Sequence, residues 1–578
     1  MKNVFIIILL FAVVLTTACN KKQGTNKNSQ AEATDVWDVN TDSVSFYLKQ
    51  LITQMENDPG FEVNGELIFS YTVLPEYYKR NDFNWAWSEG INRREAAEAL
   101  SKSWRDGLMP EDYHLDQIME LANDIANEKQ NPDPQTVAKL DMLLTDGVLL
   151  YAFHLIKGKL NPQNYDVTWN FYTRDLPAHP ADMLEGALHN KEVQNMLRGL
   201  RPGFYAYRNM LEGMDKYTKI REQGGWESVE LKETLTPGQS NAVVPYLWKR
   251  LAAEGYIDQM PDSLTEQYDE VLMEAVKHFQ DNHGLNSDGN IGKNTVLALN
   301  ESVDALINKL KVNLERSRWL LNETEKERIL LVNIAKYQAI LVENDSILYR
   351  TNVMVGKEQH QTPLFREEMK HVVFNPTWTV PRSIATREMI PKLKRDPNYL
   401  RRNNMVALNS KGEILDDSNI DWSKYSANHF PFTIRQEPGP HNALGKVKFL
   451  FPNKYSIYLH DTPSKYLFAK EMRAFSHGCI RVENPLNLAE EILDDPDKWN
   501  QESIQRILKT KKQTWVPLEK PIDVLLFYWT AGPNNNGELF FINDVYKRDD
   551  KLLWALTKED WDKMVVESRK RASSELNN

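Results

Sequence analysis

Cysteine is scarce in this chain of 578 residues, which contains only Cys19 and Cys479. Basic runs and internal repeats are also missing, and the formal net charge is -11. Because a nucleic-acid partner calls for a basic patch that neutralises phosphates, this charge argues against nucleic-acid binding. The chain does have apolar material, with 41% hydrophobic and 10% aromatic residues. A chain of this length and composition can bury several cores, so we expect two to four domains.

The N-terminal apolar run Val4–Leu15 is too short to span a bilayer comfortably. Together with Thr16–Ala18 it is typical of a secretory signal that is cleaved before Cys19. A cysteine at this point resembles the bacterial lipoprotein signal, so residues 1–19 are expected to be a lipoprotein signal peptide whose Cys19 becomes lipidated. An ordinary signal peptide, with Cys19 incidental, is the alternative. Residues 20–60 begin with a polar stretch without periodicity and are expected to form a flexible tether.

Lipidation of Cys19 would leave Cys479 as the one thiol of an exported protein, unable to form an intramolecular disulfide. An unpaired exported thiol is a liability unless it does chemistry, so Cys479 is a candidate nucleophile. Two other interpretations stay open. A lone cysteine is most often a small buried hydrophobe. A zinc site of His460, His477 and Cys479 is also conceivable, although no second cysteine or paired histidine motif supplies the remaining ligands.

Two short strands are predicted around this cysteine. The run Tyr455–Leu459 predicts a strand that ends in His460 at the mouth of a loop. The run 479–482 predicts a second strand. In strand geometry Cys479 and Arg481 share one face, so their thiol and guanidinium groups are expected to face one cleft.

A thiol attacks a carbonyl group as thiolate, so it needs a base or a cation that lowers its pKa from about 8.5. His460 is the candidate base. The neighbouring Asp461 would point away from the imidazole in a strand, so a backbone carbonyl is expected to orient the ring. The loop of Ser476, His477 and Gly478 is expected to aim backbone amides at a developing oxyanion, and Gly478 permits the sharp turn.

His460 and the sequence Ser-His-Gly-Cys-Ile-Arg at Ser476–Arg481 together resemble the active-site signature of the L,D-transpeptidases of bacterial cell-wall synthesis. Smaller members usually have Asn where this chain has Arg481, which is similar to the large multidomain branch. Further segments resemble the same branch: Val332-Asn333-Ile334, Val355-Gly356, Thr362-Pro363, 374–378, Val380-Pro381, 442–445, Lys448-Phe449 and 451–453.

The resemblance implies an α+β, multidomain fold. It combines a mostly β catalytic domain with a helical scaffold domain and an inserted three-helix peptidoglycan-binding domain. The expected segments are the scaffold at 61–216, the peptidoglycan-binding domain at 237–300, a linking helix at 301–327, the catalytic domain at 328–545 with a capping insertion at 381–432, and a C-terminal tail at 546–578.

The same resemblance implies an exported L,D-transpeptidase of the periplasm, anchored in the membrane through its N-terminal lipid. Cys479 would attack the stem tetrapeptide of peptidoglycan, release D-alanine and pass the acyl group to an amine of another stem. Arg481 would either pair with a stem carboxylate or hold the loop, and Tyr458 and Trp378 would line the donor site. No metal or cofactor is needed. An L,D-carboxypeptidase with water as acceptor, or a non-catalytic wall-binding lipoprotein, is the alternative.

Overall fold

The structure is a computed structural model that describes residues 37–128, 131–166, 168, 170–171, 174–320, 328–344, 346–534, 536–558 and 561–576. The expected signal peptide with Cys19, the first part of the tether and the end of the linking helix lie outside the described residues. The chain divides into two compact units, one of 1–160, 174–215 and 551–578, the other of 161–173 and 216–550. No helix in the described part of the chain is both long enough and apolar enough to cross a membrane.

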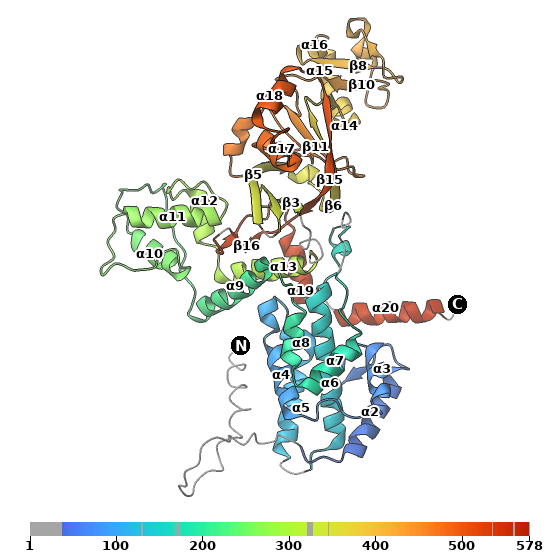
Figure 1. Ribbon diagram of the computed structural model, residues 1–578. Coiled ribbons are helices and arrows are strands. Elements are labelled where there is room, and N and C mark those ends of the chain that lie inside the picture. The colour runs from blue at the N-terminus through green and yellow to red at the C-terminus, as the bar shows by residue number, and fades with distance from the viewer. Residues whose placement is uncertain are drawn as a thin grey trace. The chain divides into compact units, whose positions relative to one another are not determined.

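The first unit is helical and is built around α6, which spans Pro134–Lys157 and is buried along most of its length (Figure 1). Around it lie α2 (Thr41–Met55), α3 (Val73–Arg80), α4 (Gly90–Ser101), α5 (Leu115–Asn127), α7 (Pro180–Asn190) and α8 (Val193–Gly199). A helix that is apolar on all sides must pair its few polar groups internally. Asp141 accepts from the Tyr78 hydroxyl at 2.7 Å, and Asp146 accepts from His114 Nε2 at 2.8 Å. His114 also lines a cavity of about 830 Å³ in this unit. None of the predicted site residues lines this cavity.

Two segments differ from the sequence-based expectation. Part of the expected tether, Thr41–Met55, is the helix α2, because its apolar residues recur at helical spacing and Val44, Leu48, Ile52 and Met55 are buried. Part of the expected C-terminal tail is also helical, as α19 (Asp549–Lys558) and α20 (Trp561–Leu576). Within the helical unit Arg569 of α20 donates to the carbonyl oxygens of Pro59 and Ile68, so this segment is tied to the unit.

The second unit is built on a nine-stranded sheet in the order β13-β5-β14-β12-β11-β6-β15-β3-β4. Because β5 also pairs with β4, the sheet closes on itself and leaves β13 at its margin. The mixed helical and sheet composition confirms the α+β, multidomain prediction. The strands are β3 (Arg328–Asn333), β4 (Gln338–Glu343), β5 (Ser346–Gly356), β6 (Phe365–Phe374), β11 (Val447–Leu450), β12 (Leu459–His460), β13 (Ala474–Ser476), β14 (Ile480–Val482) and β15 (Thr514–Phe527).

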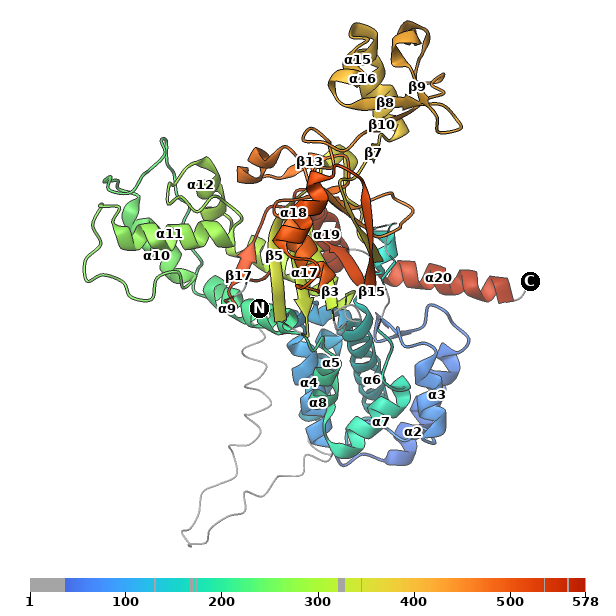
Figure 2. The ribbon, with the colours of Figure 1, turned by 45° about the horizontal axis from the view of Figure 1, so that its top comes forward.

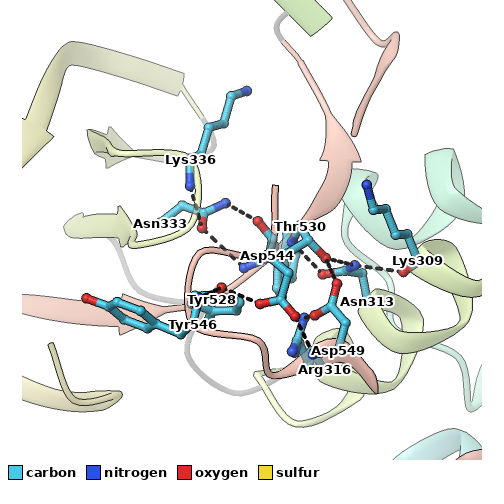
Figure 3. A network of polar contacts seen from close by, with 11 residues as sticks. Lys309, Asn313, Arg316, Asn333, Lys336, Tyr528, Thr530, Asp544, Tyr546 and Asp549 are labelled. Carbon is cyan, nitrogen blue, oxygen red and sulfur yellow. Dashed lines mark hydrogen bonds and ion pairs between the residues drawn. The ribbon is translucent and has the colours of Figure 1, made fainter. Parts of the chain in front are cut away.

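A polar network fastens the segment after β15 to the helix α13, which spans Val303–Arg318 (Figure 3). Asn313 donates to Thr530 Oγ1 at 2.8 Å and accepts from the Thr530 amide at 2.9 Å. The Thr530 hydroxyl donates to Asp549 at 2.6 Å, and the other Asp549 oxygen lies 2.6 Å from Arg316. Since these groups are buried, the network fixes α13 to the segment that follows β15 of the nine-stranded sheet.

A cap interrupts the sheet between β6 and β11. It has a small sheet in the order β7-β10-β8-β9, and Figure 2 shows its elements gathered in a lobe of their own. Residues from its helices and strands, including Leu393, Ala407 and Ile434, form a separate apolar core. The cap extends beyond the expected 381–432, because its two flanking strands pair with each other. Its elements are β7 (Trp378–Thr379), α14 (Arg382–Ile384), η6 (Ala385–Met389), α15 (Ile390–Arg395), α16 (Tyr399–Arg402), β8 (Met405–Leu408), β9 (Ile414–Leu415) and β10 (Thr433–Gln436).

An insertion before α13 forms three helices, α10 (Val244–Ala253), α11 (Glu270–Asn282) and α12 (Lys293–Leu299), around their own apolar core. The two ends of this insertion are clasped together. Val229 and Asn300 exchange two hydrogen bonds of 2.7 and 2.8 Å, and Trp226 Nε1 donates to the Glu301 carbonyl at 3.0 Å.

Candidate active site

Strand pairing collects the candidate catalytic side chains on one face of the sheet. His460 of β12 lies opposite Arg481 of β14 in a parallel pair and opposite Lys448 of β11 in an antiparallel pair. Directly paired residues point to the same face, and so do residues two apart in a strand. Cys479 therefore shares the face of Arg481, as the sequence predicted, while Ile480 and Val482 are buried in the core on the other face.

Cys479 is half-buried and directly precedes β14. Its Sγ lies 3.6 Å from the Ser456 carbonyl oxygen, to which the thiol donates. The hydroxyl of Tyr458 is also hydrogen-bonded to the cysteine side chain. Burial raises the pKa of the Cys479 thiol, while Tyr458 and the charges of Lys448 and Arg481 act in the opposite direction. Burial and positive charge thus have opposite effects on the pKa of the thiol.

His460 is buried, with 5% of its surface exposed. Its Nδ1 lies 2.5 Å from the carbonyl oxygen of Asp461. A carbonyl oxygen can only accept, so Nδ1 carries the proton and the lone pair of Nε2 is left open. Burial lowers the pKa of His460 to about 3, and the charges of Arg481 and Lys448 act in the same direction. The imidazole is therefore neutral and holds the tautomer that can accept a proton at Nε2.

The carboxylate of Asp461 is engaged elsewhere. It accepts from the Lys446 amide at 2.8 Å, and Lys465 Nζ lies 2.8 Å from its other oxygen. This geometry agrees with the expectation that a backbone carbonyl, and not the Asp461 side chain, orients His460. The carbonyl is that of Asp461 itself.

The loop before Cys479 is held by hydrogen bonds on both sides of Gly478. The Gly478 amide donates to Ser476 Oγ at 3.0 Å, and Thr362 Oγ1 donates to the Gly478 carbonyl at 2.7 Å. Gly478 has a φ of +118°, which side chains other than glycine rarely adopt. Because the Gly478 amide is occupied, it is not free to hold an oxyanion. Among the described residues the amides of His477 and Cys479 have no acceptor, so these two are the open donors of the loop.

His477 contacts the cap. Its Nε2 lies 2.8 Å from Glu388 of η6, and its ring stacks on His360 with centroids 5.0 Å apart. Within the described residues no group of three or more His, Cys, Asp or Glu side chains could hold a metal ion, and the zinc ligands considered from the sequence form no such group.

Tyr458 and Trp378 meet beside the thiol. The Tyr458 hydroxyl, which bonds Cys479, also receives a hydrogen bond from the Trp378 side chain.

The expected strand Tyr455–Leu459 is wrong, because only Leu459–His460 is a strand. Ser456 has a φ of +57°, and Asn453 Oδ1 accepts from the amides of residues 455 and 457, so a turn precedes the strand.

Sequence reasoning did not assign Lys448 to the site. Its Nζ lies 3.9 Å from the centroid of the Tyr458 ring, and its half-buried side chain adjoins Cys479. The alternation of Val447, Lys448 and Phe449 puts a lysine on the polar face of a buried strand, which is the signal that could have pointed to it. Only the pairing of β11 with β12 brings this lysine to the thiol, and that pairing is not local in sequence.

Comparisons with known proteins agree with this arrangement. Residues 327–514 match the family model described as the L,D-transpeptidase catalytic domain. Residues 72–214 match the model of a scaffold domain. Residues 240–299 match the model described as "Putative peptidoglycan binding domain".

A curated relative from Haemophilus influenzae, named "Putative L,D-transpeptidase", is 34% identical over 254 residues, which cover 44% of this chain and 50% of that protein. The match thus spans about half the length of the relative. Two solved L,D-transpeptidases are also similar. The one from Xylanimonas cellulosilytica is 14% identical, with a TM-score of 0.17 and coverage of 52% of this chain and 100% of that chain. The one from Stackebrandtia nassauensis is 13% identical, with a TM-score of 0.21 and coverage of 51% and 94%. TM-scores this low do not establish a shared fold.

Proposed function

Since residues 327–514 match the L,D-transpeptidase catalytic domain, we propose that this protein cross-links peptidoglycan through an acyl-enzyme on Cys479. The substrate is the stem tetrapeptide, and the bond attacked joins the diamino acid at position three to the terminal D-alanine. The observation that carries the proposal is the placement of Cys479, His460 and Arg481 on one face of two paired strands.

In the first half-reaction Cys479 Sγ attacks the carbonyl carbon of the diamino acid. The thiol proton passes to the open Nε2 of His460 and from there to the amine of the departing D-alanine. In the second half-reaction the side-chain amine of another stem attacks the thioester, and His460 takes the amine proton. The C–S bond then breaks, and His460 returns the proton to Sγ. The open amides of His477 and Cys479 supply donors for the oxyanion of both tetrahedral intermediates.

The remaining groups bind and place the donor stem. Arg481 either pairs with a stem carboxylate or holds the loop, and its buried Nε, which has no acceptor among the described residues, favours the carboxylate. Tyr458 and Trp378 line the donor site through their hydrogen bond beside the thiol. The three-helix insertion binds the sacculus, and lipidation of Cys19 anchors the exported protein in the membrane, on its periplasmic side.

The test uses purified protein and soluble stem tetrapeptides, followed by mass spectrometry. We expect an acyl adduct on Cys479, released D-alanine and cross-linked stems, all absent in Cys479→Ala. Cys19→Ser is the matched control, because it removes the other cysteine and should leave the soluble reaction intact. Cross-linking by Cys479→Ala would refute the proposal. Tripeptide without cross-links would instead identify an L,D-carboxypeptidase.

A further inference from the structure

Two cations lie on the face of the sheet that carries Cys479, and neither has an anionic partner in the described part of the chain. Lys448 and Arg481 lie on either side of His460 in the strand pairing. Both are half-buried, and the charged neighbour that each of them has is Cys479. Placing two positive groups together away from water is unfavourable unless an anion joins them. The arrangement is therefore an anion site, and the sulfur lies in it.

The side chain of Lys448 is held toward the thiol. Its Nζ lies 3.9 Å from the centroid of the Tyr458 ring, which is the geometry of a cation–π contact. The hydroxyl of the same tyrosine is hydrogen-bonded to Cys479. One aromatic ring thus supports the lysine with its face and the sulfur with its hydroxyl group.

His460 cannot supply this positive charge in the resting protein. Its ring is buried and neutral, and its Nδ1 proton is directed to the Asp461 carbonyl. The imidazole therefore adds no positive charge beside Cys479 until it takes the thiol proton. The charge must come from another group on the same face of the sheet.

We propose that the Lys448 ammonium group, together with Arg481, holds Cys479 as the thiolate that attacks the substrate. The S–H bond breaks, the proton passes to His460 Nε2, and the negative charge stays on Sγ between the two cations. When the C–S bond forms, that charge moves to the carbonyl oxygen. This role deepens the proposed transpeptidase function and depends on it only for the identity of the electrophile.

Burial raises the pKa of Cys479, and three side chains act in the opposite direction. Lys448 comes from β11, Tyr458 directly precedes β12, and Arg481 belongs to β14. Lys465 acts on His460 in the same direction as the two cations. Removal of Lys448 takes away a positive charge, so the thiol should ionise at higher pH, and His460 should at the same time become a better base.

The experiment measures alkylation of Cys479 by iodoacetamide in the full-length protein as a function of pH, with peptide mass spectrometry to locate the adduct. In Lys448→Met the midpoint should rise by about one pH unit, and alkylation near pH 7 should slow by about tenfold. Above the midpoint of the variant the two rates should converge, because the thiolate then forms without help. Lys448→Arg should restore the wild-type midpoint.

Lys454→Met is the matched control. Lys454 is exposed and also lies over a tyrosine ring, that of Tyr455 at 5.1 Å, so its removal should leave the midpoint unchanged. Circular dichroism checks the fold, and Lys448→Gln replaces Lys448→Met if the latter does not fold. An unchanged midpoint, or an equal slowing at every pH, would overturn the inference. Since iodoacetamide needs no stem peptide, a normal lysine effect without cross-linking would refute the proposed function alone.

Discussion

The buried imidazole of His460 makes the stability of the catalytic sheet depend on pH in one direction. In the unfolded chain histidine has a pKa of about 6.5, whereas the folded pKa of His460 is about 3. Between these values the unfolded chain binds a proton that the folded sheet does not. Folding stability is therefore retained above about pH 6.5 and falls as the pH drops toward 3. At about pH 4.5 the gap of two units corresponds to a loss of about 2.7 kcal/mol.

His460→Gln removes this term and should be less acid-sensitive than the wild type. Hydrogen exchange, followed on peptides that contain β12 and β14, measures the opening free energy of this part of the sheet in both proteins at the same pH. From about pH 7 to 4.5 the difference between variant and wild type should move by about 2.7 kcal/mol in favour of the variant. A difference that stays constant would show that His460 is not held neutral by burial, and the assigned tautomer would lose its support.

Three further outcomes are expected. Burial opposes the charge of His114, but the hydrogen bonds from His114 to Asp146 and Glu66 outweigh burial and raise the pKa of His114 to about 9. The protonated His114 should stabilise the helical unit by about 2.5 kcal/mol at pH 7 relative to His114→Gln, and this stabilisation should vanish by about pH 10. Hydrogen exchange of α6 measures both values. Gly478→Ala places a residue with a side chain at a φ of +118° and brings its Cβ against Ile457, so stem acylation should fall by about tenfold or more. Gly412→Ala is the control, because Gly412 also has a positive φ, of +80°, but an added Cβ there would meet no neighbouring atom, so acylation should not fall. Replacing 230–299 by a short Gly-Ser linker should weaken sedimentation with sacculi more than the reaction with soluble stems, and equal losses would contradict separate roles.

The spacing of apolar residues along the chain was sufficient to predict parts of this fold. Helical spacing of apolar residues predicted α6, and alternation around Cys479 predicted that the thiol and Arg481 share one face. The three helices of the insertion were expected from the family resemblance alone. The same spacing is present in α2, at Val44, Leu48 and Ile52, but it follows a polar stretch and was included in the tether. That segment could have been predicted from its own residues.

Other features depend on contacts between distant residues. Lys448 reaches the thiol only because β11 pairs with β12, and the strand expected over 455–459 is interrupted by the side chain of Asn453. Whether the Gly478 amide is free depends on the side-chain rotamer of Ser476, which accepts from it, and sequence spacing does not predict that rotamer. Sequence reasoning thus named the candidate catalytic residues, while the electrostatic environment of the sulfur required the sheet register.

The clasp at the base of the three-helix insertion has a consequence for how such chains diversify. Val229 and Asn300 join the two ends of the insertion by paired hydrogen bonds, so the host backbone leaves and re-enters at one closed neck. The insertion also touches the host beyond this neck, because His278 lies 2.6 Å from Glu538 and Asn294 donates to Glu471 at 2.7 Å. Replacing the insertion would keep the path of the host backbone but remove these two contacts. A domain of other binding specificity that carries matching donors at these two positions could be exchanged at the neck, which would change what the chain binds and leave the sheet with Cys479 unaltered.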